Sequence, residues 1–216
     1  MLLHKIMSEN LFTVYPHTVV TDAQDLMRRE HIHHLPVIDE HTKKIVGIVS
    51  EKDLIYASPS PASTLDVYEM TRLLSKLTVK KVMTKDALTA GRNDLVEDAA
   101  RRMVDNHISC LPVVDEKGYP VGIVTQTDIF RLFIDLFGTR DKGIRATLRI
   151  PETQGELARL ATDITNNQGN IISIGTLPGD SPTNAVCIVK VSGMSKEQFV
   201  TAVEKHILEV IDLREV

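Results

Sequence analysis

Two ten-residue stretches decide the fold: HIHHLPVIDE at 31–40 and HISCLPVVDE at 107–116. The second repeats the first at an offset of 76 residues, from position 31 to position 107. The match extends upstream, where KIMS at 5–8 corresponds to KVMT at 81–84, and downstream, where VGIVSEKDL at 46–54 corresponds to VGIVTQTDI at 121–129. Self-similarity of this kind indicates one structural unit that occurs twice and stacks on its neighbour.

Each copy predicts a small α/β unit. Apolar residues at three- and four-residue steps predict a helix that ends near His31 in the first copy and near His107 in the second. An apolar strand, an acidic turn and a second strand follow, which is typical of a β-hairpin, and a second helix is expected from Ser50 or Thr125. Each sheet would leave apolar surface bare, so we expect the copies to form a pseudo-twofold pair.

Both copies resemble CBS domains, and residues 1–138 resemble a tandem CBS pair, or Bateman module. The resemblance rests on the strands LPVID and LPVVD, on the G-h-h-[ST]-x-x-D segment and on the leading h-M-[ST], which all occur twice in register. It implies CBS domains at 1–58 and 77–138. The SPSPAS stretch at 58–63 and the amphipathic residues after it predict a linker with a connecting helix at 59–76.

The segments GIVSEKD at 47–53 and GIVTQTD at 122–128 are the informative ones, because in each a strand runs into a helix N-terminus. Unpaired backbone N–H groups there favour an anion, and an aspartate can accept both hydrogen bonds of a ribose diol. The same [ST]-x-x-[DE] pattern is also a capping box that only satisfies the helix end. The family resemblance implies that its Ser, Thr and Asp residues contact the ribose of an adenosine ligand. The predicted nucleotide-binding residues are Ser50, Asp53, Thr125, Asp128, His33, His34, Gly47, Gly122, Pro36 and Pro112.

The two predicted sites are unequal, because His33 and His34 correspond to Ser109 and Cys110 at the 76-residue offset. The resemblance implies that the histidines contact phosphate, and such a contact would strengthen as the pH falls toward about 6. The alternative is that these histidines lie in a surface loop and contact no phosphate. The histidines of 31–41 lack nearby ligands at known metal-site spacings, so no metal site is expected.

From Arg145 onward the pattern predicts strand, helix, strand, strand, helix and strand, the βαββαβ order of a ferredoxin-like fold. Residues 144–216 resemble an ACT domain through Pro151, Gly155 and Leu157 and through the G-N-I entry at 169–171. The resemblance implies dimerisation and, in many members, an amino acid bound between copies. Gly155 and Asn170 are the candidate residues for that ligand. The expected fold class is therefore α/β (α+β), with two CBS domains followed by a ferredoxin-like ACT domain.

Composition excludes several classes of function. With a formal net charge of −4 and no concentrated Lys and Arg, the chain is not expected to bind nucleic acid. The two cysteines, Cys110 and Cys187, form no C-x-x-C motif, and the first twelve residues resemble neither a signal peptide nor a spanning helix, so a cytoplasmic protein without membrane partners is expected. No catalytic triad, P-loop or dinucleotide fingerprint stands out, so we expect no catalytic residues and no catalytic cofactor.

The order of two CBS domains and an ACT domain resembles the bacterial acetoin-utilization accessory protein family over essentially the whole chain. The resemblance implies a non-catalytic homodimeric regulator that binds an adenine nucleotide, AMP or ATP first, and acts on an unidentified enzyme of acetoin or butanediol catabolism. The apolar run DIFRLFIDLFG at 128–138 favours burial against another subunit. Two alternatives stay open: an amino-acid sensor at an ACT dimer interface, and a purely structural dimerisation module.

Overall fold

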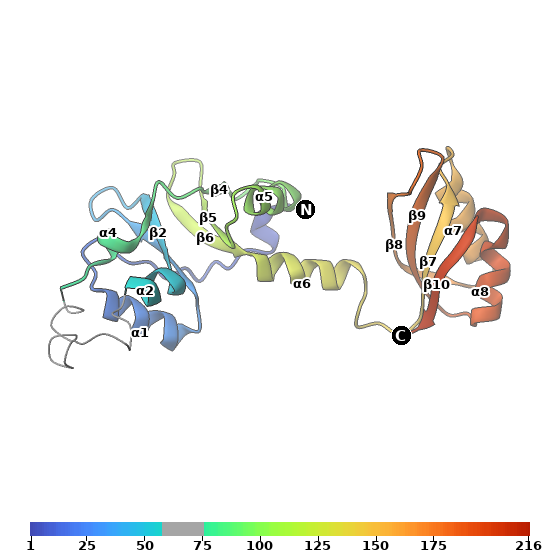
Figure 1. The fold of residues 1–216 in the computed structure, drawn as a ribbon, viewed down its shortest axis with the longest axis horizontal. Coiled ribbons are helices and arrows are strands. Elements are labelled where there is room, and N and C mark those ends of the chain that lie inside the picture. The colour runs from blue at the N-terminus through green and yellow to red at the C-terminus, as the bar shows by residue number, and fades with distance from the viewer. Residues whose placement is uncertain (58–75) are drawn as a thin grey trace. The chain divides into compact units, whose positions relative to one another are not determined.

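The computed structural model describes residues 1–57 and 76–216, which form two compact units, Met1–Ile129 and Phe130–Val216 (Figure 1). A linker with a connecting helix is predicted at 59–76. Residues 58–75 lie outside the described part of the chain, so the structure describes only position 76 of that prediction. Within the described residues, no helix is long and apolar enough to cross a membrane.

The first repeat forms the predicted helix, hairpin and second helix. After the short 3-10 helix η1 (Leu3–Lys5), α1 spans Val20–Glu30, β1 spans His34–Ile38, β2 spans Ile45–Ser50 and α2 spans Glu51–Ala57. α1 ends because His31 adopts a left-handed conformation with φ of 54°, and the N–H of Ile32 returns to the carbonyl of Met27 at 2.9 Å. β1 and β2 pair antiparallel, which confirms the predicted hairpin.

The second repeat reproduces these elements. α4 (Val79–Val82), β3 (Thr84–Lys85) and β4 (Ala90–Gly91) precede α5 (Val96–Asp105), β5 (Cys110–Val114), β6 (Pro120–Thr125) and α6 (Gln126–Leu136). His107 has φ of 53° where His31 has 54°, and the register Cys110↔Thr125 repeats His34↔Ser50. The internal symmetry of the sequence is therefore also a symmetry of the backbone.

The segments that lead the two repeats are exchanged between them. β3, which begins at the last residue of the second h-M-[ST] motif, pairs with β2 of the first repeat, with Ile48 opposite Thr84. In the reciprocal arrangement Ser8 and Ile123 of β6 exchange hydrogen bonds of 2.9 and 3.0 Å. The boundaries 1–58 and 77–138 remain a prediction along the chain, but in space each repeat is completed by the leading residues of the other.

Gly47 and Gly122 make this exchange possible. A Cβ atom on Gly47 would lie 2.6 Å from the carbonyl oxygen of Thr84, and one on Gly122 would lie 2.8 Å from that of Ser8. Both contacts are with backbone, which cannot move aside without loss of pairing. The two glycines are therefore required for the close approach of the exchanged segments, whatever their role near a ligand.

The core of the first repeat shows the same exchange. Its fully buried residues include Leu35, Val49 and Leu54 from the first copy together with Val79 from beyond the linker. Leu77, Val82 and Met83 also pack against this cluster. Full burial of Val79, roughly 1.5–3 kcal/mol, together with the partial burial of the other three, holds the second leading segment on the first repeat.

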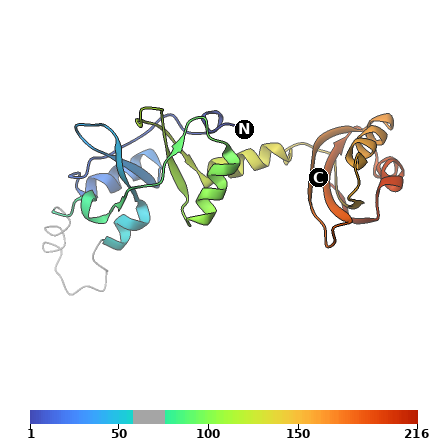
Figure 2. The same ribbon diagram turned by 90° about the horizontal axis from the view of Figure 1, so that it is seen from above.

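The C-terminal unit is a four-stranded antiparallel sheet with two helices on one face (Figures 1 and 2). Its elements are β7 (Ile144–Pro151), α7 (Glu156–Asn166), β8 (Asn170–Pro178), β9 (Asn184–Ser192), α8 (Lys196–Val203), the 3-10 helix η2 (Glu204–His206) and β10 (Glu209–Glu215). The strand order β10-β7-β9-β8 is that of a ferredoxin-like fold, and it confirms the predicted βαββαβ sequence of elements.

Strict alternation along β7 separates the two faces of this sheet. Ile144, Ala146, Leu148 and Ile150 are buried in a cluster with the helix residues Leu160, Ile164 and Phe199. The intervening residues Arg145, Thr147 and Arg149 lie on the opposite face. One face is thus an apolar core under α7 and α8, and the other carries charge.

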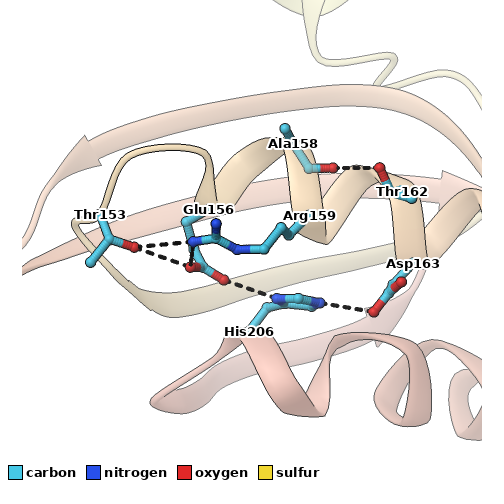
Figure 3. A network of polar contacts seen from close by, with 7 residues as sticks. All are labelled: Thr153, Glu156, Ala158, Arg159, Thr162, Asp163 and His206. Carbon is cyan, nitrogen blue, oxygen red and sulfur yellow. Dashed lines mark hydrogen bonds and ion pairs between the residues drawn. The ribbon is translucent and has the colours of Figure 1, made fainter.

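A buried histidine joins α7 to η2 (Figure 3). His206 is 8% exposed; its Nδ1 lies 2.9 Å from Oε1 of Glu156, and its Nε2 lies 2.9 Å from Oδ2 of Asp163. Glu156 also accepts hydrogen bonds from Arg159 at 2.6 Å and Thr153 at 3.1 Å. This polar network fixes the end of α8 against α7.

Candidate CBS-pair ligand site

A cavity of about 630 Å³ opens in the first unit between the two repeats. Its size is in the range of small-molecule sites, which run to roughly 300–1,000 Å³. The first repeat contributes the β1–β2–α2 side of the cavity, and the second contributes the segment after β3 and the start of β5. The lining residues are His34, Ile48, Ser50, Lys52, Asp53, Thr84, Asp86, Ala87, Leu88, Asn106, His107, Ile108, Ser109, Cys110, Pro112 and Gln126.

Ser50 and Asp53 form reciprocal hydrogen bonds at the wall of this cavity. Oδ2 of Asp53 accepts from the backbone N–H and the hydroxyl of Ser50, at 2.8 and 2.7 Å, and the N–H of Asp53 donates to the Ser50 hydroxyl oxygen at 3.2 Å. These are capping-box contacts. Both hydrogen bonds that the Asp53 carboxylate accepts use Oδ2, and Oδ1 has no partner in residues 1–57 and 76–216. Capping and ligand binding are therefore compatible at Asp53.

Thr125 and Asp128 repeat this geometry in the second copy but do not line the cavity. Oδ2 of Asp128 accepts from the N–H and hydroxyl of Thr125 at 2.9 and 2.7 Å, and the reciprocal bond is 3.4 Å long. Asp128 is only 7% exposed. The two equivalent motifs thus differ in their access to the cavity.

The two adjacent histidines point to different environments. His33 is exposed, its Nδ1 lies 2.7 Å from Oε2 of Glu51, and it does not line the cavity. His34 lines the cavity, and its Nε2 lies 2.9 Å from the hydroxyl of Ser109 in the other repeat. Burial, followed by the nearby His33, lowers the pKa of His34. A lowered pKa favours the neutral ring of His34, and the phosphate contacts of both histidines stay a prediction.

The remaining predicted residues are two prolines and two glycines, and most of them support the backbone fold and do not line the cavity. Pro112 lines the cavity, whereas Pro36 is buried in β1, where its carbonyl accepts from Val14 at 3.1 Å. Gly47 and Gly122 are not among the lining residues and support the exchanged strands. Of the ten predicted residues, the structure brings His34, Ser50, Asp53 and Pro112 together around the cavity.

Sequence reasoning missed the contribution of 84–88. Thr84, Asp86, Ala87 and Leu88 line the cavity because β3 joins the sheet of the first repeat. Their only signal in the sequence is that Thr84 ends the second h-M-[ST] motif and the others follow it. The cavity also contains Cys110, whose thiol has its pKa raised to about 12 by burial and so stays protonated.

Gly155 and Asn170, the candidates in the C-terminal unit, lie at the ends of α7 and β8. Gly155 precedes α7 with φ of 84°, a conformation that favours glycine, and Asn170 begins β8 with an exposed side chain. A cavity of about 350 Å³ in this unit is lined at the β8–β9 end by residues such as Leu177 and Asn184, and neither candidate lines it. In the described parts of the chain, no group of three or more His, Cys, Asp or Glu side chains gathers as metal ligands.

Comparison with known proteins identifies the repeated unit. The family model of the CBS domain matches residues 3–60 and 79–135, which together are more than half of the chain. The chain belongs to the CBS-domain family. The cavity described above is therefore the cleft of a CBS pair.

Relatives of this CBS protein include enzymes and a CBS domain-containing protein of Dictyostelium discoideum, which is 31% identical over 62% of this chain and 91% of its own. L-aspartate semialdehyde sulfurtransferase of Methanocaldococcus jannaschii is 33% identical over 132 residues, 61% of this chain and 23% of the enzyme. The chain spans about a quarter of the length of the first curated relatives that it matches.

Many solved structures are similar to the CBS pair, among them a ligand complex and a bacterial protein. The CBS domain pair of protein MJ0100, in complex with 5′-methylthioadenosine and S-adenosyl-L-methionine, is 31% identical with a TM-score of 0.52 over 65% of this chain and 98% of its own. An acetoin utilization protein (AcuB) from Vibrio cholerae is 28% identical, also with a TM-score of 0.52, over 65% of this chain and 95% of its own.

Proposed function

We propose that this CBS protein is a non-catalytic regulator that binds an adenosine-containing ligand in the cleft of its CBS pair. The observation that carries the proposal is the position of Asp53, which lines the 630 Å³ cavity with Oδ1 unpaired among the described residues. A ribose diol can donate to the two lone pairs of that oxygen. The bound 5′-methylthioadenosine and S-adenosyl-L-methionine of the similar MJ0100 pair support an adenosine moiety.

Charge in the cleft favours ligands with few phosphates. The Lys, Arg, Asp and Glu side chains that line it are one cation, Lys52, and two carboxylates, Asp53 and Asp86. Two histidines also line it, His107 and His34, and burial lowers the pKa of His34. A triphosphate would need more compensating positive charge than this in a partly desolvated site. We therefore propose AMP or a nucleoside thioether as the ligand in preference to ATP.

Isothermal titration tests the site. AMP, ATP and S-adenosyl-L-methionine are titrated into the wild type, Asp53→Ala, Asp128→Ala and the control Glu116→Ala, which changes an exposed carboxylate in the β5–β6 turn. Loss of hydrogen bonds to a charged acceptor, worth about 1.5–3 kcal/mol, is expected to weaken binding to Asp53→Ala by about ten- to hundredfold. Asp128→Ala is expected to have a smaller effect. If folded wild-type protein gives no saturable heat, the motifs are helix caps only.

The regulatory role and assembly rest on the family resemblance and on α6. We propose a homodimer that regulates an enzyme of acetoin or butanediol catabolism, supported by the structural likeness to AcuB. Phe130, Phe133 and Leu136 on α6 are 64%, 56% and 60% exposed, which is costly in water unless another surface covers them.

An ACT-type amino-acid site is a second proposal. The ferredoxin-like strand order and the left-handed Gly155 at the β7–α7 turn favour it. It predicts that amino acids bind and that Gly155→Val abolishes this binding, while Asp53→Ala leaves it unaffected.

A further inference from the structure

A row of charged residues crosses the open face of the C-terminal sheet. In the register of the strands, Arg214 of β10 is opposite Arg145 of β7, and Arg145 is opposite Lys190 of β9, which is opposite Ser173 of β8. Like charges that are directly opposite in an antiparallel pair destabilise a sheet, because their Cβ atoms are about 4.5–5.5 Å apart. Three neighbouring cations in one row therefore require compensating negative charge.

The structure supplies one carboxylate to this row. Asp212 pairs with Arg214, with contacts of 2.6–3.0 Å, and with Nη1 of Arg145 at 3.3 Å. No described carboxylate pairs with Lys190. The row consequently has an excess of positive charge at its Lys190 end.

Lys190 is buried at that end. Lys190 is only 4% exposed. Its ammonium donates one hydrogen bond of 2.8 Å to the carbonyl oxygen of Gly138, which lies just beyond the end of α6. The negative end of the helix dipole offsets part of its charge. An ammonium has three N–H donors, and among the described residues one of them is satisfied. A buried charge in this state is costly unless a further acceptor is present.

A cavity of about 140 Å³ lies beside the ammonium. Lys190, Arg145, Ser173 and Thr139 line it with polar groups, and Phe137 and Ile188 line it with apolar ones. None of its lining side chains is acidic, and the last residue, Val216, also lines it, with a main-chain oxygen that accepts from the N–H of Gly143 at 2.9 Å. The volume corresponds to roughly five water-sized volumes of about 30 Å³. It has room for a small organic anion and excludes a nucleotide.

We propose that this cavity binds a small monocarboxylate, with the carboxylate on Lys190 and Arg145 and a short aliphatic group against Phe137 and Ile188. A single negative charge matches the partly compensated ammonium, and the apolar wall disfavours a fully hydrated ion such as phosphate. The site lies on the sheet face opposite α7 and α8, does not include Gly155 or Asn170, and is independent of the adenosine ligand proposed for the CBS cleft.

The test uses the full chain and isobutyrate as the probe, with binding followed by the methyl resonance of Ile188. Isobutyrate is expected to shift this resonance saturably, and its uncharged isostere isobutyramide is expected to bind at least tenfold more weakly. Lys190→Met is expected to weaken isobutyrate binding at least tenfold. The control Lys205→Met removes an exposed lysine of η2 and is expected to leave the affinity unchanged.

Ile188→Phe is a second test variant, which keeps the proposal testable if Lys190→Met does not fold. It fills the cavity but retains the ammonium, so it is expected to abolish isobutyrate binding, with the resonances of neighbouring Val186 as the readout. The proposal is overturned if the wild type shows no saturable shift, or if isobutyramide binds as tightly as isobutyrate. It is also overturned if inorganic phosphate displaces isobutyrate at equal concentration, or if a folded Lys190→Met or Ile188→Phe protein binds isobutyrate like the wild type.

Discussion

His206 couples the protonation of one residue to the stability of the C-terminal unit. Both ring nitrogens face carboxylates, which only accept hydrogen bonds, so both nitrogens carry protons and the ring is an imidazolium. The hydrogen bond to Asp163, followed by that to Glu156, raises the pKa of His206 against the effect of burial. Arg159, through its hydrogen bond, makes the largest contribution to lowering the pKa of Glu156.

A raised pKa in the folded state makes stability fall as the pH rises. The contribution of His206 is fully present below its ordinary pKa of 6.5 and is lost as the pH passes through the higher pKa of the folded protein. We expect the free energy of opening of α7 and β7, measured by hydrogen exchange after correction for the intrinsic rate, to decrease from pH 6 to pH 9. In His206→Gln this slope is expected to be flatter, with the free energy lowered by roughly 1–3 kcal/mol at pH 6.

The control for His206 is His41→Gln, which changes an exposed histidine in the β1–β2 turn. It is expected to retain the wild-type slope. Equal slopes in the wild type and His206→Gln would show that the imidazolium does not stabilise this unit. Tyrosine fluorescence would not report the effect, because all four tyrosines precede residue 130.

At the scale of elements, the exchanged leading segments make each CBS repeat depend on residues of the other. Leu3 is fully buried, and the N–H groups of Leu3 and Val96 bond to the carbonyls of Asp94 and Met1. We expect Leu3→Ala to destabilise by about 2–5 kcal/mol, as a large-to-small core substitution does. The loss of amide protection is expected first in α5 and β6 of the second repeat.

Leu54→Ala is the matched control for Leu3→Ala. Leu54 is equally buried but belongs to the core of the first repeat, so protection should be lost first in α1 and β2. If Leu3→Ala instead reduced protection chiefly in the first repeat, the exchange of leading segments would be contradicted.

At the scale of the whole molecule, α6 carries the apolar residues that a second copy would cover. We expect the wild type to be a dimer by light scattering, and Phe133→Glu to shift it toward monomer, because a desolvated carboxylate in an apolar interface is costly. Asp135→Asn, on the same helix but with an exposed polar side chain, is expected to remain a dimer. A wild type that is monomeric at micromolar concentration would contradict the proposed homodimer.

The elements of both units were predictable because each follows from local pattern. The 76-residue repeat predicted the paired hairpins, and the pattern from Arg145 onward predicted the βαββαβ order of elements. The helix after Ser50 and the contacts between Ser50 and Asp53 were also predictable, because a capping motif acts within four residues.

The composition of the cleft was not predictable in the same way. Thr84 and its neighbours reach Ser50 only because β3 crosses to the first repeat, and His33 turns to Glu51 while His34 faces Ser109. Likewise the register of β7 with β9 places Arg145 beside Lys190, although 45 residues separate them along the chain. The sequence by itself determined the repeat, the order of elements and the capping motifs, because these depend on periodicity and short-range hydrogen bonds. Only the tertiary structure decided which side chains share a cavity, because that depends on packing between segments that are distant along the chain.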